Sequence, residues 1–264
     1  MLDMNQIIGS HDLLLITLDT LRYDVARTAL DTGQLPTLSR YITHWEQRHA
    51  PGSFTYSAHH ALFAGFFPTP VTNPQAERLF ALAFPGSETT AQTTCVLNAP
   101  NIIEGLAQAG YATVCIGGVG FFNQQTPLGC VFPNMFEKAY WSPELGVTHP
   151  DSTANQVTLA LDILAHRNKT QPLLMFINVS AIHQPNHVYV DGETVDSIDT
   201  HAAALRYVDR QLAPLLEAFQ RQRPTLVIIC SDHGTAYGED GYKGHRLAHE
   251  VVWTVPYAEF ILGG

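Results

Sequence analysis

The segment Thr225-Leu-Val-Ile-Ile-Cys-Ser-Asp-His-Gly234 decides the fold that this sequence can adopt. It begins with an almost continuous apolar run that is β-branched at residues 227–229, which predicts a strand buried on both faces. Asp232 and His233 follow this strand directly. Because α/β proteins bind ligands at the carboxyl edge of a parallel sheet, the segment predicts a pair of metal ligands at that edge. A polar surface loop is the alternative interpretation.

Other apolar runs predict further strands, at residues 12–18, 111–116, 172–180 and 255–262. Local patterns, mostly apolar residues at helical spacing, predict helices at residues 20–29, 36–48, 57–64, 75–84, 101–109, 151–166 and 200–220. Strands that alternate with helices need crossover connections. The sequence therefore predicts an α/β fold with a mostly parallel sheet and helices on both faces. We expect a single domain over residues 1–264, in which residues 69–150 form a lid or specificity region.

The composition restricts the classes of function. The chain has 264 residues, 45% of them apolar, and a formal net charge of −10. Proteins that bind nucleic acid need a basic face, so this acidic balance argues against such a partner, although a local cation would still admit a small anionic substrate. The apolar run near the N-terminus is too short for a signal peptide or a membrane span, and the cysteines show no disulfide framework. We therefore expect a cytoplasmic protein without a membrane partner.

Candidate ligands follow other strands as well. The strand at 12–18 ends on Asp19, and the strand at 172–180 leads to His183. Together with Asp232 and His233, these residues would meet at the sheet edge where α/β proteins bind ligands. Asp19 or its neighbour Thr20 could instead cap the next helix, and the sequence leaves both interpretations open.

Thr55 precedes a short helix predicted at residues 57–64. The N-terminus of a helix presents backbone N–H groups and the positive end of the helix dipole, so an oxyanion or phosphate is favoured there. The Thr55 hydroxyl is therefore either a cap or a nucleophile. Arg22 and Lys243 are further candidates for contact with an anion.

The order of these motifs resembles the alkaline phosphatase/sulfatase superfamily of metallohydrolases. Leu14-Leu-Ile-Thr-Leu-Asp-Thr-Leu-Arg-Tyr-Asp24 is similar to the first strand of that family with its metal aspartate, and residues 55–68, which end in Gly-Phe-Phe-Pro, are similar to its nucleophile segment. Tyr207-Val-Asp-Arg-Gln-Leu212 is similar to a helix that precedes the last metal motif. Ser231-Asp-His-Gly234, Gly244-His245 and Val255-Pro256 complete the order.

The resemblance implies that Asp19, Asp232 and His233 bind a divalent metal and that Thr55 is both a ligand and the nucleophile. It also implies that His183 and His245 contact the transferred group or, with His187, a second metal. Mixed carboxylate and imidazole ligands favour zinc or manganese. The expected function is that of a metal-dependent hydrolase or transferase acting on a small anionic phosphate ester, phosphodiester or phosphonate.

The sequence departs from the sulfatase pattern at the nucleophile. Sulfatases convert a cysteine or serine within Cys/Ser-x-Pro-x-Arg to formylglycine, whereas this chain has Thr55, Ser57 and His59 at those positions. Threonine cannot yield formylglycine, so phosphoryl transfer is favoured, and Asp19-Thr20 is more similar to the phosphodiesterase and phosphoethanolamine-transferase branches. Two alternatives stay open. One is a sulfate-ester hydrolase with an unmodified threonine; the other is a non-catalytic metal-binding accessory protein, because the C-terminal subdomain of many relatives is missing.

Overall fold

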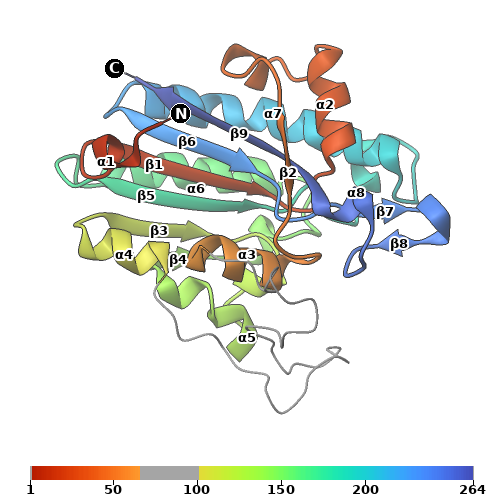
Figure 1. The fold of residues 1–264 in the computed structure, drawn as a ribbon, viewed down its shortest axis with the longest axis horizontal. Helices are drawn as coiled ribbons and strands as arrows, with labels where there is room; N and C mark the ends of the chain where they lie inside the picture. The colour runs from red at the N-terminus through yellow and green to blue at the C-terminus, as the bar shows by residue number, and fades with distance from the viewer. Residues whose placement is uncertain (1, 66–100, 264) are drawn as a thin grey trace.

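The structure is a computed structural model that describes residues 2–65 and 101–263. Its main sheet has seven strands within these residues, in the order β2-β9-β6-β1-β5-β3-β4 (Figure 1). Five strands run parallel: β1 (Asp12–Leu18), β3 (Ala112–Ile116), β4 (Lys138–Tyr140), β5 (Leu173–Val179) and β6 (Thr225–Cys230). β9 (Thr254–Leu262) is antiparallel to both of its neighbours, β6 and β2 (Glu46–His49). The prediction of a mostly parallel α/β sheet is confirmed.

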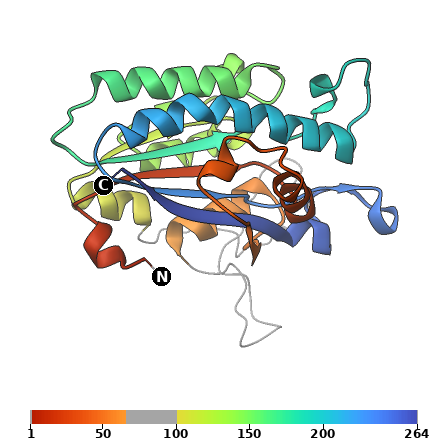
Figure 2. The ribbon, with the colours of Figure 1, turned by 90° about the horizontal axis from the view of Figure 1, so that it is seen from above.

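Alternate residues of the central strands face two different cores. In β1, Leu14, Ile16 and Leu18 pack with α2 (Tyr23–Asp31), α6 (Ser152–His166) and α7 (Ile198–Gln220). Leu13 and Leu15 face the opposite core, which contains α3 (Thr55–Ala64), α4 (Ile102–Gln108) and several phenylalanines. Figure 2 shows α6 and α7 on one side of the sheet and α3 on the other. Because helices cover both faces, the strands need apolar residues at nearly every position.

The remaining elements are short. The helices are α1 (Met4–Ile7), α5 (Pro127–Cys130) and α8 (Glu250–Trp253), and the strands β7 (Ala236–Tyr237) and β8 (Lys243–Gly244) form a separate hairpin. The 3-10 turns are η1 (Leu38–Arg40), η2 (Gly120–Phe122), η3 (Pro133–Met135), η4 (Pro143–Leu145), η5 (His187–Tyr189) and η6 (Glu239–Gly241). The hairpin projects beyond the carboxyl edge of the sheet, beside α8 (Figure 1).

The helix predicted at residues 36–48 is wrong. Only η1 is helical there, and the polar residues Glu46–His49 form β2, which pairs with Thr254–Tyr257 of β9. The buried Asp209 of α7 accepts hydrogen bonds from the backbone N–H groups of Thr37 at 3.0 Å and Leu38 at 2.9 Å. These bonds hold a turn against α7, and strand pairing with β9 competes successfully with helix formation.

The region predicted as a lid is only partly described. Residues 66–100 lie outside the described part of the chain, and the helix predicted at 75–84 falls there. The described part, from residue 101 onward, contributes α4, β3 and β4 to the sheet and its covering layer. A role of residues 69–150 in specificity stays a prediction.

Candidate metal centre

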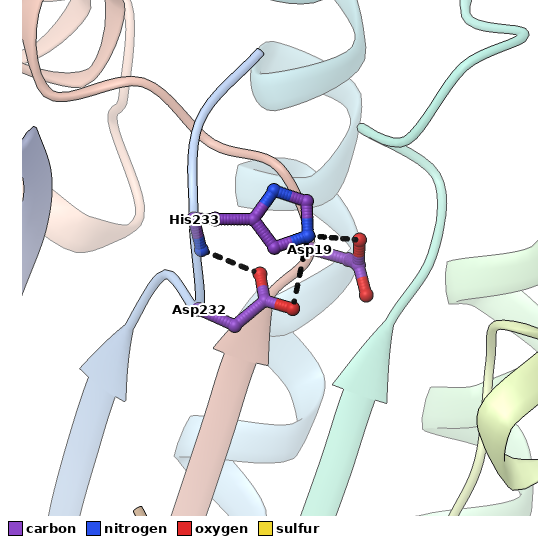
Figure 3. Close-up of side chains that lie close together, drawn as sticks. All are labelled: Asp19, Asp232 and His233. Atoms are coloured by element: carbon purple, nitrogen blue, oxygen red, sulfur yellow. Dashed lines mark hydrogen bonds and ion pairs between the residues drawn. The ribbon is translucent and has the colours of Figure 1, made fainter. Parts of the chain in front are cut away.

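The ends of β1 and β6 bring three predicted ligands together. The two strands are neighbours, with Thr17 opposite Cys230, so the residues that follow them share one edge of the sheet. Asp19, Asp232 and His233 are fully buried, and one potential ligand atom from each lies within 4.8 Å of the others. Figure 3 shows both carboxylates directed toward the imidazole.

Asp19 and Thr20 do not cap a helix. The helix α2 begins at Tyr23, its N-cap is Arg22, and no side chain makes a capping hydrogen bond there. Asp19 Oδ2 instead accepts a hydrogen bond from Asn178 Nδ2 at 3.1 Å. The structure therefore favours the site interpretation of Asp19 over capping.

Two carboxylate oxygens in this cluster lack hydrogen-bond partners. Asp19 Oδ1 and Asp232 Oδ2 are buried without a hydrogen bond. Burial raises the pKa of both carboxyl groups, and the negative charge of Asp232 raises the pKa of Asp19 further. Buried anionic oxygens are costly unless a positive charge compensates them, and a bound cation would supply that charge.

The imidazole of His233 is oriented as a metal ligand requires. Its Nδ1 lies 2.9 Å from the carbonyl oxygen of Gly234, so Nδ1 carries the proton and donates. This leaves the Nε2 lone pair facing Asp232 Oδ2 at 3.5 Å and Asp19 Oδ1 at 3.9 Å. Burial lowers the pKa of His233 to about 4, which favours the neutral ring. Two carboxylates and a neutral imidazole held by a backbone carbonyl fit a divalent zinc or manganese ion.

Gly234 is required for this arrangement of the loop. A Cβ atom at this position would lie 2.0 Å from the carbonyl oxygen of Val251, and the Gly234 N–H donates to the Val252 carbonyl at 2.7 Å. The segment before β9 therefore packs directly against the backbone that follows His233. A larger residue at 234 would displace the loop that carries two of the three candidate ligands.

Thr55 lies beside the cluster at the start of α3. The helix begins at Thr55 itself, two residues before the predicted start, and its N-cap Phe54 makes no side-chain capping bond. The Thr55 Oγ1 atom lies 3.4 Å from Asp19 Oδ2 and 3.3 Å from His233 Nε2. Its hydroxyl therefore contacts the candidate ligands instead of capping α3.

Two of the surrounding groups were not predicted from the sequence. Asn178 on β5 binds Asp19, and the backbone N–H of Thr20 donates to Asp232 Oδ1 at 3.2 Å. Thr20 has a φ of 64°, which is rare for a β-branched residue and is typical of strained backbone at functional sites. The signal for Asn178 was present, because it is a polar residue inside an otherwise apolar strand.

The other predicted histidines are divided between two places. His245 lies against His233 with ring centroids 4.6 Å apart, and His183 lies 5.5 Å from His245. Burial and the neighbouring histidines lower the pKa of His245 to about 2. His187, by contrast, pairs with Asp196 at 3.0 Å. In the described residues, the one group of three clustered metal-ligating side chains is Asp19, Asp232 and His233.

The cationic residues proposed as anion contacts lie elsewhere. Arg22 is buried and forms ion pairs with Asp24 at 2.6 Å and with Glu239. Two carboxylates therefore already neutralise its charge. Lys243 is exposed on β8. Neither side chain provides a free cation next to Thr55.

Comparisons with known proteins identify the fold family. The family model described as Sulfatase matches residues 12–257. A comparison with curated proteins found no match.

Three similar solved structures share this fold. The soluble domain of lipooligosaccharide phosphoethanolamine transferase A from Neisseria meningitidis has a TM-score of 0.67 and 16% identity, over 96% of this chain and 77% of that chain. The C-terminal periplasmic domain of phosphoethanolamine transferase EptC from Campylobacter jejuni has a TM-score of 0.64 and 15% identity, over 97% and 81%. The corresponding domain of EcEptC from Escherichia coli, solved in complex with zinc, has a TM-score of 0.64 and 16% identity, over 95% and 72%.

The predicted cytoplasmic location is wrong in the light of these comparisons. Two of the three structures are periplasmic domains, which points away from the cytoplasm. The cytoplasmic location was predicted from the short N-terminal apolar run and from the lack of a disulfide framework. Neither feature distinguishes a cytoplasmic domain from a periplasmic one. Within residues 2–65 and 101–263, no helix is long and apolar enough to cross a membrane.

The family match extends over β1, α3, β6 and the beginning of β9, and so includes all four residues of the candidate site. The predicted resemblance to the alkaline phosphatase/sulfatase superfamily is confirmed by this match and by the shared fold. The chain therefore belongs to the sulfatase family.

Proposed function

We propose that this chain is a metal-dependent phosphoryl-transfer enzyme that uses Thr55 as its nucleophile. The observation that carries the proposal is the contact of Thr55 Oγ1 with both Asp19 and His233 at the candidate metal centre. The related folds of two phosphoethanolamine transferases support a phosphate-containing substrate, and the zinc complex of the EcEptC domain supports a metal. Because position 55 holds threonine, formylglycine chemistry is disfavoured.

Each residue has a defined part in the proposed reaction. A bound divalent cation would lower the pKa of the Thr55 hydroxyl and neutralise a phosphoryl oxygen. The Thr55 hydroxyl gives up its proton to water as its oxygen bonds to phosphorus, and the ester oxygen leaves with the bonding electrons and takes up a proton. Water or an acceptor alcohol then cleaves the phosphothreonine, which gives hydrolysis or transfer respectively.

His245 is the proposed proton donor, with His183 beside it. The metal-free site keeps His245 neutral, because burial lowers its pKa. An anionic substrate next to the ring would raise that pKa by Coulomb attraction, so substrate binding would itself favour the protonated form.

The test measures turnover of an aryl phosphate, a phosphodiester, a phosphonate and an aryl sulfate, with zinc or manganese and with a chelator. We expect phosphoryl turnover that the chelator abolishes, and a loss of at least about 1000-fold in kcat for Thr55→Ala, because the nucleophile is removed. Intact-mass analysis should show one added phosphoryl group in the wild type and none in Thr55→Ala.

Thr113→Ala is the matched control. Thr113 is also a buried threonine with a hydrogen-bonded hydroxyl, but it lies on β3, where it accepts from the Glu137 N–H at 2.9 Å. This variant should lose stability and keep its kcat. Wild-type turnover in Thr55→Ala would refute the proposal, and preferred turnover of the aryl sulfate would favour the sulfate-ester alternative.

A further inference from the structure

A continuous chain of buried hydrogen bonds runs from Asp19 to the backbone of Thr55. It starts at Asn178, whose Nδ2 donates to Asp19 Oδ2 at 3.1 Å and to Thr17 Oγ1 at 3.2 Å. Thr17 Oγ1 lies 3.1 Å from His59 Nε2, and His59 Nδ1 lies 2.8 Å from the Thr55 carbonyl oxygen. Asn178, Thr17 and His59 are all fully buried.

The direction of each hydrogen bond in this chain is fixed. The Asn178 Oδ1 atom accepts from the Val119 N–H at 2.9 Å, which sets the orientation of the amide. The Thr55 carbonyl can only accept, so His59 Nδ1 must carry a proton. In a neutral ring, Nε2 is then an acceptor, and the Thr17 hydroxyl donates to it while accepting from Asn178. Every group finds a partner in one arrangement.

The position of His59 is fixed by its surroundings as well. Its ring lies among Phe63, Phe122, Phe132 and Phe176, with centroid separations between 5.2 and 5.8 Å. Beyond these rings, the His59 Nδ1 atom also lies 3.6 Å from Asp232 Oδ2. The hydrogen bonds of its two nitrogen atoms set the orientation of the ring: Nδ1 faces the Thr55 carbonyl on α3, and Nε2 faces Thr17 on β1.

We propose that His59 is a positioning residue that joins the carbonyl of Thr55 to strand β1 and thereby fixes the nucleophile relative to Asp19. This inference rests on the proposed function. His59 occupies the position of the arginine in the sulfatase signature, and in this chain it bonds to the backbone of the nucleophile and to Thr17. The cation that an arginine would bring is replaced by a neutral hydrogen-bonding bridge.

Two substitutions separate the two ends of the bridge. Asparagine can place its amide nitrogen near the histidine Nδ1 position and so keep the bond to the Thr55 carbonyl. Glutamine can place its amide near the Nε2 position and so keep the bond to Thr17. Since small displacements of a nucleophile cost up to about 100-fold in rate, we expect His59→Gln to lower kcat by about 100-fold and His59→Asn by about 10-fold. KM should change by less than about twofold, because His59 lies beneath Thr55 and has no proposed contact with the substrate.

His60→Gln is the matched control. His60 is the next residue of α3, is also buried, and lies 2.6 Å from the Tyr56 hydroxyl through its Nε2 atom. We expect this variant to lower the melting temperature and to leave kcat unchanged. An equal loss of kcat in His60→Gln and His59→Gln would overturn the proposal, as would His59 variants that melt earlier but keep the wild-type kcat.

A spectroscopic measurement tests the bridge without catalysis. The ¹⁵N chemical shifts of His59, assigned by comparison with His59→Asn, should identify the neutral Nδ1–H tautomer with a slowly exchanging proton. An Nε2–H tautomer or an imidazolium would overturn the proposal even if Thr55 is the nucleophile. If Thr55→Ala retains full turnover, the proposed function fails, and the positioning role with it, even where the tautomer is found as expected.

Discussion

The two buried carboxylates of the candidate metal centre make the metal-free protein less stable than its fold alone would allow. Asp232 Oδ1 accepts hydrogen bonds from the backbone N–H groups of Thr20 and His233, whereas Oδ2 has no hydrogen-bond partner. Burial raises the pKa of this carboxyl group, so the folded state favours its protonated form. A raised carboxyl pKa means that stability is lost as the pH rises from the unfolded value to the folded one.

Asp232→Asn should therefore have opposite effects with and without metal. Asparagine keeps the Oδ1 acceptor and removes the charge. In a chelator at pH 8, we expect the variant to be about 1–2 kcal/mol more stable than the wild type, because one of the two buried carboxylate charges is removed and its repulsion of Asp19 with it. With excess zinc the order should reverse, because the variant loses a ligand. Chemical denaturation under both conditions is the measurement, and a variant that is less stable than the wild type in the chelator would contradict the explanation.

The site could be predicted from the sequence only where residues stand at the end of an element. Asp19, Asp232 and His233 follow buried strands. Thr55 begins a helix, in a segment that is similar to the nucleophile segment of the superfamily. Thr17, His59 and Asn178 were not assigned a role, because they lie inside elements. Whether such a residue faces a site or a core depends on strand register and on which helix covers that face, and neither can be read from one sequence.

At the scale of elements, the β7–β8 hairpin is fastened to the loop after β1 by an ion pair. Glu239 bonds to the buried Arg22, and its Oε2 atom accepts from the Tyr237 N–H at 2.6 Å. Partial burial alone would raise the Glu239 pKa, but the hydrogen bonds from Arg22 and the backbone outweigh it and lower the pKa to about 2. This contact connects the segment between Asp232 and His245 to the segment after Asp19.

Glu239→Gln should remove part of the acid sensitivity of the protein. A lowered carboxyl pKa gives stability that is present above the unfolded value of 4.5 and is lost as the pH falls toward about 2. We expect the variant to be about 2 kcal/mol less stable than the wild type at pH 7, with the difference shrinking toward zero near pH 2. Denaturation curves measured across this pH range provide the test.

Glu217→Gln is the control for this prediction. Glu217 pairs with Arg40 at 3.1 Å, but both side chains are largely exposed, at 43% and 51%. Water screens such exposed ion pairs, so this variant should stay close to the wild type at every pH. An equal loss in both variants would contradict the role of the hairpin contact.

The elements themselves were predicted with unequal success, for a physical reason. Strands buried on both faces and long amphipathic helices carry their signal within one segment, and β1, β5, β6, α6 and α7 lie close to their predicted positions. The strand β2 was predicted as part of a helix. Its residues are polar and exposed, and their conformation is imposed by pairing with β9, which lies about two hundred residues later in the chain.

At the scale of the whole molecule, the candidate metal centre lies at the ends of two neighbouring strands in the middle of the sheet, β1 and β6. The strand β1 lies between β5 and β6, and its own loop carries one candidate ligand while β6 carries two. A cation bound there would join the central strands at their carboxyl ends. Separating β1 from β6, or unfolding the whole sheet, would then require the cation to leave.

Zinc should therefore slow the opening of the whole sheet. At a free zinc concentration of 100 times its dissociation constant, exchange through global unfolding should slow by about 100-fold. Hydrogen-exchange mass spectrometry should show this protection across β1, β5 and β6. Protection confined to residues 230–235 would contradict it, and the protection should disappear in Asp19→Asn.

The fold class was the part of the molecule most accessible from sequence. Alternation of buried strands with helices requires parallel crossovers, which fixed the general architecture. The strand order and the antiparallel direction of β9 were not predicted, because pairing depends on contacts between segments far apart in the chain. The residues that form the candidate site are likewise far apart in the chain, so their contacts could not be predicted directly.

The separation of the ligands along the chain has a consequence for biosynthesis. Thr20 and Asp232, which touch in the folded protein, are 212 residues apart. A ribosome therefore releases Asp19 and Thr55 long before it reaches the Asp-His pair. Until β6 is made, the nascent polypeptide offers a single carboxylate and a hydroxyl, which together hold a cation weakly. Loading with metal is thus postponed until β6 and the Asp-His pair have been made, and a translation product interrupted before them is left without the assembled centre.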